Sequence, residues 1–123
     1  MLSGLRGRNY QVIENSTEIN NLFDVLINET KLETEIKNLI IYKKALYNSK
    51  FINENELIKI LNPIINSDSI WKSHALYLVA EFFYAKNENQ KAKEFFKKIL
   101  LIPNVNNEIK TQTRKRISRD LGE

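Results

Sequence analysis

Few residues of this sequence could carry out chemistry, and the best placed are His74 and Glu81, about two helical turns apart. An imidazole and a carboxylate on one helix face could act as an acid–base pair. The chain has one histidine and no cysteine, which excludes disulfides, thiolate metal sites and cysteine nucleophiles. Its three glycines, Gly4, Gly7 and Gly122, leave no glycine-rich phosphate loop. A lone His–Glu pair does not make a catalytic site, so we expect a non-enzymatic protein without metal or cofactor.

Binding is the second kind of chemistry that the sequence offers. His74 and Glu81 share a helical stripe with two tyrosines, because the four residues are spaced by three, four and three. Tyrosine combines a large contact area with a polar tip at low entropic cost, which suits partner recognition. Two residues at corresponding places of an earlier helix complete the predicted partner-binding stripe: Tyr42, Leu46, His74, Tyr77, Glu81 and Tyr84. The alternative is a polar helix face whose tyrosines are half covered by neighbouring helices.

The net charge of +4 is distributed unevenly. Residues 14–85 carry seven basic and ten acidic residues, whereas residues 86–119 carry ten basic and three acidic ones, a net charge of +7. Such a region could bind nucleic acid, anionic lipid headgroups or an acidic partner. The alternative is a solvated outer face of a terminal helix. The densest part of this possible basic patch consists of Lys110, Arg114, Lys115, Arg116 and Arg119.

Helices must position these candidate residues, because apolar residues recur at helical spacing and no segment alternates as a strand does. Turns of two to six residues between the helices indicate antiparallel neighbours. We predict six helices, approximately over residues 16–27, 30–48, 53–62, 70–86, 90–102 and 104–121.

Capping residues and helix breakers set the predicted boundaries. Proline disfavours helical geometry at the residue before it, so Pro63 is expected to end or kink the third helix, and Gly122 is expected to stop the last one. We expect residues 1–15 to be a flexible segment and residues 16–123 to form one domain. The longest aliphatic runs are far short of the ~20 residues of a membrane-spanning helix, so we expect no such segment in this chain. The predicted N-terminal caps are Ser16, Thr30, Asn53, a residue of the cluster 67–69 (Ser-Asp-Ser), and Asn104.

A repeat of 35 residues predicts how the helices pack. The tetratricopeptide repeat has a period of about 34 residues and a helix–turn–helix plan. We therefore expect an all-α, right-handed tetratricopeptide-like solenoid, with its best repeat at residues 70–103, a degenerate repeat at 32–66 and a capping helix at 105–121. The alternative is a plain helical bundle with a similar Ala/Leu pattern. The recurring residues are Ala45 and Ala80, Leu57 and Ala92, Leu61 and Phe96, and Ile64 and Ile99.

Three stretches carry a resemblance to a known family: residues 56–65 with a Leu-x-Pro element, residues 69–75 with an aromatic-basic-x-x-Ala helix start, and residues 88–96 with an Ala-x-x-x-Phe helix. With the closing helix around residues 109–116, they resemble the C-terminal half of the YfgM-like tetratricopeptide proteins of alphaproteobacteria, ancillary to the Sec translocon. The resemblance covers roughly residues 20–121.

The resemblance implies a periplasmic location at the inner membrane, behind an N-terminal transmembrane anchor. It also implies translocon or periplasmic chaperone components as partners. The anchor and the first repeats of that family are not found in this sequence, so we expect either an excised domain or a divergent soluble relative, which would otherwise be cytoplasmic.

We therefore expect a protein–protein interaction module, the soluble part of a membrane-tethered periplasmic scaffold or chaperone-associated protein. One alternative is a nucleic-acid-binding helical domain that uses the basic C-terminal third, although the sequence has no base-reading motif. Another alternative is a helical self-assembly unit, in which an exposed end of the solenoid pairs with a second copy and gives a homo-oligomer.

Overall fold

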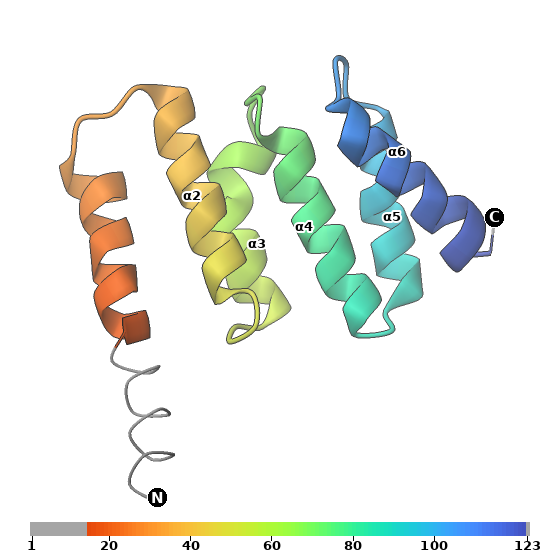
Figure 1. Cartoon of the computed structure of the whole chain (residues 1–123), viewed down its shortest axis with the longest axis horizontal. Coiled ribbons are helices and arrows are strands. Elements are labelled where there is room, and N and C mark those ends of the chain that lie inside the picture. Colours follow the sequence, from red (N-terminus) through yellow and green to blue (C-terminus); the bar gives the residue numbers. More distant parts are fainter. Residues whose placement is uncertain (1–14, 123) are drawn as a thin grey trace, which may run out of the picture.

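A computed structural model of the protein describes residues 15–122, and within that range it contains six helices and no strand (Figure 1). This confirms the predicted all-α fold. The predicted flexible segment, residues 1–15, lies outside the described residues except for Asn15, which is helical. The first helix includes residues 15–24 and ends in a π-helical turn, η1 (Val25–Glu29). Five helices follow: α2 (Thr34–Asn48), α3 (Glu54–Ile65), α4 (Lys72–Ala85), α5 (Asn89–Leu100) and α6 (Asn107–Lys115), which continues into a π-helical turn, η2 (Arg116–Asp120).

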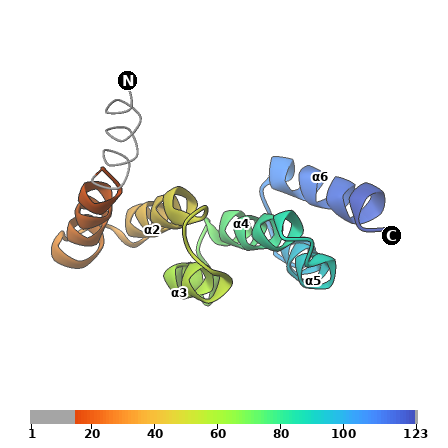
Figure 2. The ribbon, with the colours of Figure 1, turned by 90° about the horizontal axis from the view of Figure 1, so that it is seen from below.

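The helices stand side by side in a row that runs from the first helix to α6 (Figure 1). α2 and α3 form one antiparallel pair, and α4 and α5 form another. Viewed from below, α2, α4 and α6 lie in one layer, and α3 and α5 lie in the other (Figure 2). α4 contacts α2, α3, α5 and α6. Side chains of α4 can therefore meet both neighbours in their own layer.

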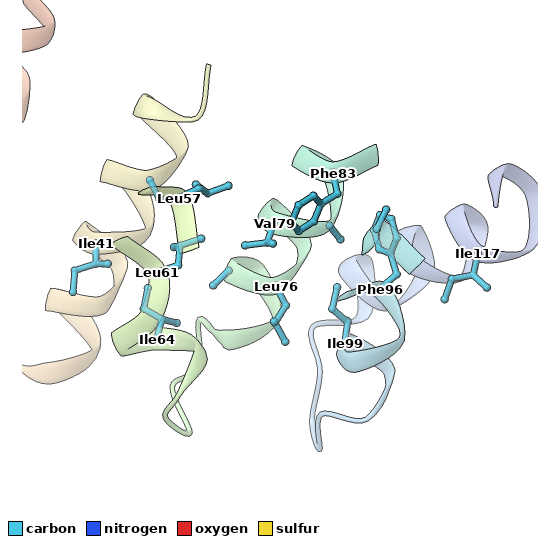
Figure 3. Close-up of a cluster of buried hydrophobic side chains, with 14 residues drawn as sticks. Ile41, Leu57, Leu61, Ile64, Leu76, Val79, Phe83, Phe96, Ile99 and Ile117 are labelled. Atoms are coloured by element: carbon cyan, nitrogen blue, oxygen red, sulfur yellow. The ribbon is translucent and has the colours of Figure 1, made fainter. Parts of the chain in front are cut away.

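The hydrophobic core lies where the helix pairs meet, with side chains of α3, α4 and α5 pointing toward one another (Figure 3). α3 and α5 begin 35 residues apart and end 35 residues apart. All eight residues of the four sequence pairs at that offset are 0% exposed. Burial of apolar surface stabilises the fold by roughly 25 cal/mol per Å², so this recurring pattern accounts for much of the core.

Small residues control how closely the helices of a pair approach. Ala80 and Ala92 are fully buried, and α4 and α5 share the most extensive contact in the described chain. In the α2–α3 pair, Leu57 takes the place of Ala92, and the contact is less extensive. A larger side chain at the crossing keeps two helix backbones farther apart.

Two predicted helix starts near the N-terminus are wrong. Ser16 lies inside the first helix, and its hydroxyl is 3.1 Å from the Tyr47 hydroxyl. Thr30 ends that helix with an extended backbone, and its hydroxyl donates to the Val25 carbonyl at 3.0 Å. α2 begins after Glu33, whose carboxylate accepts the Glu35 N–H at 3.0 Å. The hydroxyl of Thr30 therefore bonds to the end of the preceding helix instead of capping the next one. A threonine between two helices can hydrogen-bond to the backbone on either side of it.

Asparagine residues cap two helices, and only one of these two capping residues was predicted. Asn53 caps α3 as predicted, accepting the Glu56 N–H at 2.9 Å. The last helix is capped by Asn106, which accepts the Ile109 N–H at 3.0 Å. The predicted cap, Asn104, instead has φ 58°, a left-handed conformation that asparagine tolerates better than most residues. Residue type could not distinguish two asparagines so close together.

The third helix runs through Pro63 to Ile65 rather than ending at Asn62. Proline removes one helical N–H and disfavours helical geometry before it. Ile64 is nevertheless fully buried, and its packing holds the last turn in place. At the other end of the chain, Gly122 has φ 76° directly after the final helical turn and its Leu121 cap, which confirms the predicted C-terminal stop.

Candidate functional site

The six residues of the predicted partner-binding stripe lie on α2 and α4, neighbours in one layer. Leu46 is 49% exposed, and the other five are half-buried. The structure divides the stripe into two groups. Tyr42 and His74 join Trp71 at the start of α4, whereas Glu81 and Tyr84 contact Arg116 of the terminal helix. Tyr77 lies between the two groups, with its ring against Phe96 of α5. Leu46 belongs to neither group and lies one helical turn after Tyr42 on α2.

Tyr42, Trp71 and His74 form an aromatic cluster between α2 and α4. The Tyr42 and Trp71 rings are stacked, with centroids 6.4 Å apart and planes 14° apart. The His74 ring meets both edge-on, 5.8 Å from Tyr42 and 5.0 Å from Trp71. The Trp71 indole N–H donates to the Glu35 carbonyl at 3.1 Å. Half-exposed rings held in this way can pack against an aliphatic or aromatic side chain of a partner.

His74 is a neutral member of this cluster. Burial lowers the pKa of His74 below its ordinary value of 6.5, because desolvation disfavours the imidazolium. Its Nδ1 is buried and has no hydrogen-bond partner within the described residues. Glu81, the other member of the possible acid–base pair, binds Arg116 instead. The structure therefore keeps these two groups apart.

Arg116 connects the terminal helix to α4. Its Nε and Nη2 donate to the two carboxylate oxygens of Glu81 at 2.8 and 2.9 Å, and its Nη1 donates to Asp120 at 2.9 Å. The guanidinium also lies 4.1 Å from the centre of the Tyr84 ring. The hydrogen bonds to Glu81 raise the pKa of Arg116, and those from Arg116 lower the pKa of Asp120. Glu81 and Tyr84 are thus engaged within the chain.

Tyr77 lies between the aromatic cluster and the Arg116 network. Its ring meets Phe96 of α5 edge-on, with centroids 5.7 Å apart. Burial raises the pKa of Tyr77 to about 12, and the neighbouring Glu81 carboxylate adds to the effect. Tyr77 therefore stays protonated at neutral pH and can act as a hydrogen-bond donor.

The predicted basic patch is divided by the same network. Arg116 is turned toward α4, and Arg119 donates to Asp120 at 3.2 Å. The remaining three side chains of the patch make no ion pair within the part of the chain that the structure describes. Arg114 and Lys115 are exposed, and Lys110 is half-buried.

Glu35 is a positioning residue that the sequence did not single out for this role. Its carboxylate accepts from the Ser69 hydroxyl at 2.7 Å, the Asn38 amide at 2.8 Å and the Ile70 N–H at 2.6 Å. The Ile70 hydrogen bond is the largest cause of its lowered pKa. Glu35 and Ile70 are 35 residues apart, so the repeat offset could have indicated this contact. By fixing the segment before Trp71, Glu35 positions the aromatic cluster.

Residues 15–122 contain no group of three or more potential metal-ligating side chains. None of their helices has the length and apolar character needed to cross a membrane. No protein-family model, curated protein or solved structure matches this chain.

Proposed function

We propose that this protein is a non-enzymatic protein-interaction module, a short right-handed tetratricopeptide-like array that binds a peptide or protein partner. Two observations support the array. α3 and α5 begin 35 residues apart and also end 35 residues apart. Four buried residues of the α2–α3 pair have buried counterparts 35 residues later in the α4–α5 pair. Successive pairs that present the same buried positions are typical of stacked helical repeats.

The aromatic cluster of Tyr42, Trp71 and His74 is the single observation that carries the binding function. Its rings come from two helices and are half-buried, so part of their apolar surface is not covered by the chain itself. Arg116 already occupies the other half of the stripe. The proposed contact surface is therefore the first half of the stripe, with exposed Leu46 beside it.

Site-specific photocrosslinking tests this proposal. A benzoylphenylalanine at Leu46 should give a discrete adduct in cells of the native host, because that side chain is exposed beside the cluster. The matched control is the same probe at Lys59, which is exposed on α3 in the other layer. Adducts of the same mass from both positions, or none from Leu46, would contradict the proposal. Tyr42→Ala should remove the Leu46 adduct while leaving the helical circular dichroism unchanged.

The resemblance to the YfgM-like tetratricopeptide proteins extends the proposal to location and partner. On that basis alone, we propose a site of action on the periplasmic face of the inner membrane and a partner among translocon or periplasmic chaperone components. Mass spectrometry of the Leu46 adduct would identify the partner directly. A cytoplasmic protein in that adduct would contradict this part of the proposal and leave the module itself standing.

Self-assembly is a second candidate function, favoured by the first helix. Leu22, Val25 and Leu26 are exposed on it, and one face of three large apolar residues could pair with a second copy. Sedimentation over a concentration series tests this candidate. A monomer at all concentrations would remove it, whereas a dimer lost in Leu22→Lys would support it.

Nucleic-acid binding through the basic patch is less well supported, because Arg116 is committed to Glu81. The exposed Arg114 and Lys115 could still contact phosphate. Such binding would weaken steeply with salt through counterion release. No retention on mixed DNA and RNA at low salt would remove this candidate.

A further inference from the structure

A groove opens at one end of the α4–α5 pair, on the side of α4 that faces α5 rather than α2. It has a volume of about 790 Å³ and is lined by residues of the segments that precede α4 and α6, which lie at the same edge of the row of helices (Figure 1). Ile70 and Leu101 in its wall are 68% and 81% exposed, while Leu76 beneath them is 2% exposed. Leu76 belongs to the core as well as to the groove, and it lies on the side of α4 nearest Ile99 (Figure 3). The groove thus has an apolar floor and an apolar rim.

The equivalent place in the α2–α3 pair is filled by the chain itself. There, the Glu35 carboxylate accepts from Asn38 of its own helix and from Ser69 in the next connecting segment. The carboxylate thereby closes the end of the first pair. At the offset of 35 residues, these three residues correspond to Ile70, Ser73 and Asn104, all of which line the groove.

The second pair keeps the polar partner but lacks the carboxylate. Ile70 stands where Glu35 stands in the first pair, and its aliphatic side chain cannot accept a hydrogen bond. Ser73, the counterpart of Asn38, is only 4% exposed, and its hydroxyl makes no hydrogen bond within residues 15–122. Ser73 lines the groove, and its hydroxyl is not sealed off from the water there. It is therefore available to donate to an acceptor supplied from outside the chain.

The charges around the groove favour an anionic acceptor. Lys72 and Lys98 line it together with one acidic residue, Asp68. Neither lysine forms an ion pair in the described part of the chain, and the Lys98 Nζ lies 4.6 Å from the centre of the Phe95 ring. The groove also adjoins the N-terminal turn of α4, where the helix dipole favours negative charge. Two lysines without an ion pair, beside a hydroxyl donor in the wall of the groove, form a receptor for a carboxylate.

We propose that this groove binds an extended segment of a partner protein in which an aspartate or glutamate adjoins a large aliphatic residue. The carboxylate takes the position that Glu35 occupies in the first pair, accepting from the Ser73 hydroxyl beside Lys72 and Lys98. The aliphatic side chain packs on Leu76 and Leu101. This surface is separate from the aromatic cluster, so the inference goes beyond the proposed function.

Selection from a random dodecapeptide library displayed on phage, with the full chain as bait, tests the proposal. The enriched peptides should share an acidic residue next to Leu, Ile or Val. In a synthetic copy of the strongest binder, replacing that residue by its amide should weaken binding about tenfold, the loss of roughly one charge-assisted hydrogen bond. The amide signals of Ser73 and Leu101 should shift when the peptide is titrated into labelled protein.

Three variants distinguish the groove from the stripe. Ile70→Glu supplies the missing carboxylate from within the chain and should weaken the peptide about tenfold or more while leaving the fold intact. Ser73→Ala should also weaken it, whereas Tyr42→Ala should leave its affinity unchanged. The proposal would be overturned if the selection enriched no peptide, or only peptides without an acidic residue. It would also be overturned if Ile70→Glu bound the peptide as well as the natural protein does, or if Tyr42→Ala lost binding. Loss only in Tyr42→Ala would support the stripe instead.

Discussion

The Arg116 guanidinium binds the Glu81 carboxylate through two parallel hydrogen bonds of 2.8 and 2.9 Å, across 35 residues of sequence. This contact joins the last helix of the described chain to the central helix, α4. The same guanidinium covers Tyr84. One side chain thus fixes the end of the row and determines how much of the stripe remains open.

Arg116→Ala should lower the free energy of unfolding by about 1.5 kcal/mol, because a bidentate, partly buried pair is worth more than an exposed one. Arg119→Ala is the matched control. It removes an exposed arginine that also contacts Asp120, and it should cost less than about 0.5 kcal/mol. Urea unfolding measures both. Equal losses in the two variants would mean that the Glu81 contact contributes nothing specific.

Glu35→Gln should lower the urea midpoint at pH 7, because the amide cannot accept from Ser69, Asn38 and Ile70 together. The folded-state pKa of Glu35 lies below its ordinary value of 4.5. The stabilisation from the ionised form is therefore present above pH 4.5 and is lost as pH falls through the lower, folded-state pKa. The difference between the variant and the natural protein should shrink over that range. A constant difference for Glu35→Gln over that range would contradict the assignment.

The imidazole of His74 should titrate below pH 6.5 in the folded protein, because burial disfavours its charged form. Stability that depends on neutral His74 is present above pH 6.5 and falls as pH drops through the folded-state pKa. His74 is the single histidine, so its ring protons give one unambiguous NMR titration. His74→Phe should retain the aromatic contacts and remove this part of the acid sensitivity. A folded-state midpoint at or above that of the urea-unfolded chain would show that the ring is not desolvated.

Exchanging residue size at the two helix crossings should destabilise both pairs. Ala92→Leu places a large side chain where α4 and α5 approach most closely, at a cost of roughly 1–3 kcal/mol. Leu57→Ala leaves a cavity at the corresponding place of the α2–α3 pair and should cost roughly 2–5 kcal/mol. Urea unfolding with exposed Lys59→Ala as the control measures these losses. If Ala92→Leu unfolds at the same midpoint as Lys59→Ala, the α4–α5 crossing is not tightly packed.

The helices and the core could be predicted from the sequence because they depend on local spacing. Ala80 and Phe96 were expected inside from their recurrence alone, and both are fully buried. Capping residues were less predictable. Asn104 and Asn106 have the same intrinsic preference, and only the backbone conformation distinguishes the left-handed residue from the cap.

The contacts that shape the candidate site depend on tertiary structure, and residue spacing along one helix does not reveal them. Glu35 lies in the first turn of α2, where a carboxylate needs no tertiary partner to be favourable, and Arg116 belongs to the predicted basic patch. Both instead bind partners about one repeat away in sequence. Their roles require knowing which helices are neighbours, which is information that the helical period does not contain.

The row of helices also bears on how the protein acquires its structure. No helix in the described chain contacts another that is more than two helices away. Chains dominated by such short-range contacts have low contact order and fold rapidly, often within microseconds to milliseconds. Each pair could therefore complete its packing soon after leaving the ribosome. Within the described chain, the last step of this vectorial folding would be the docking of Arg116 on Glu81.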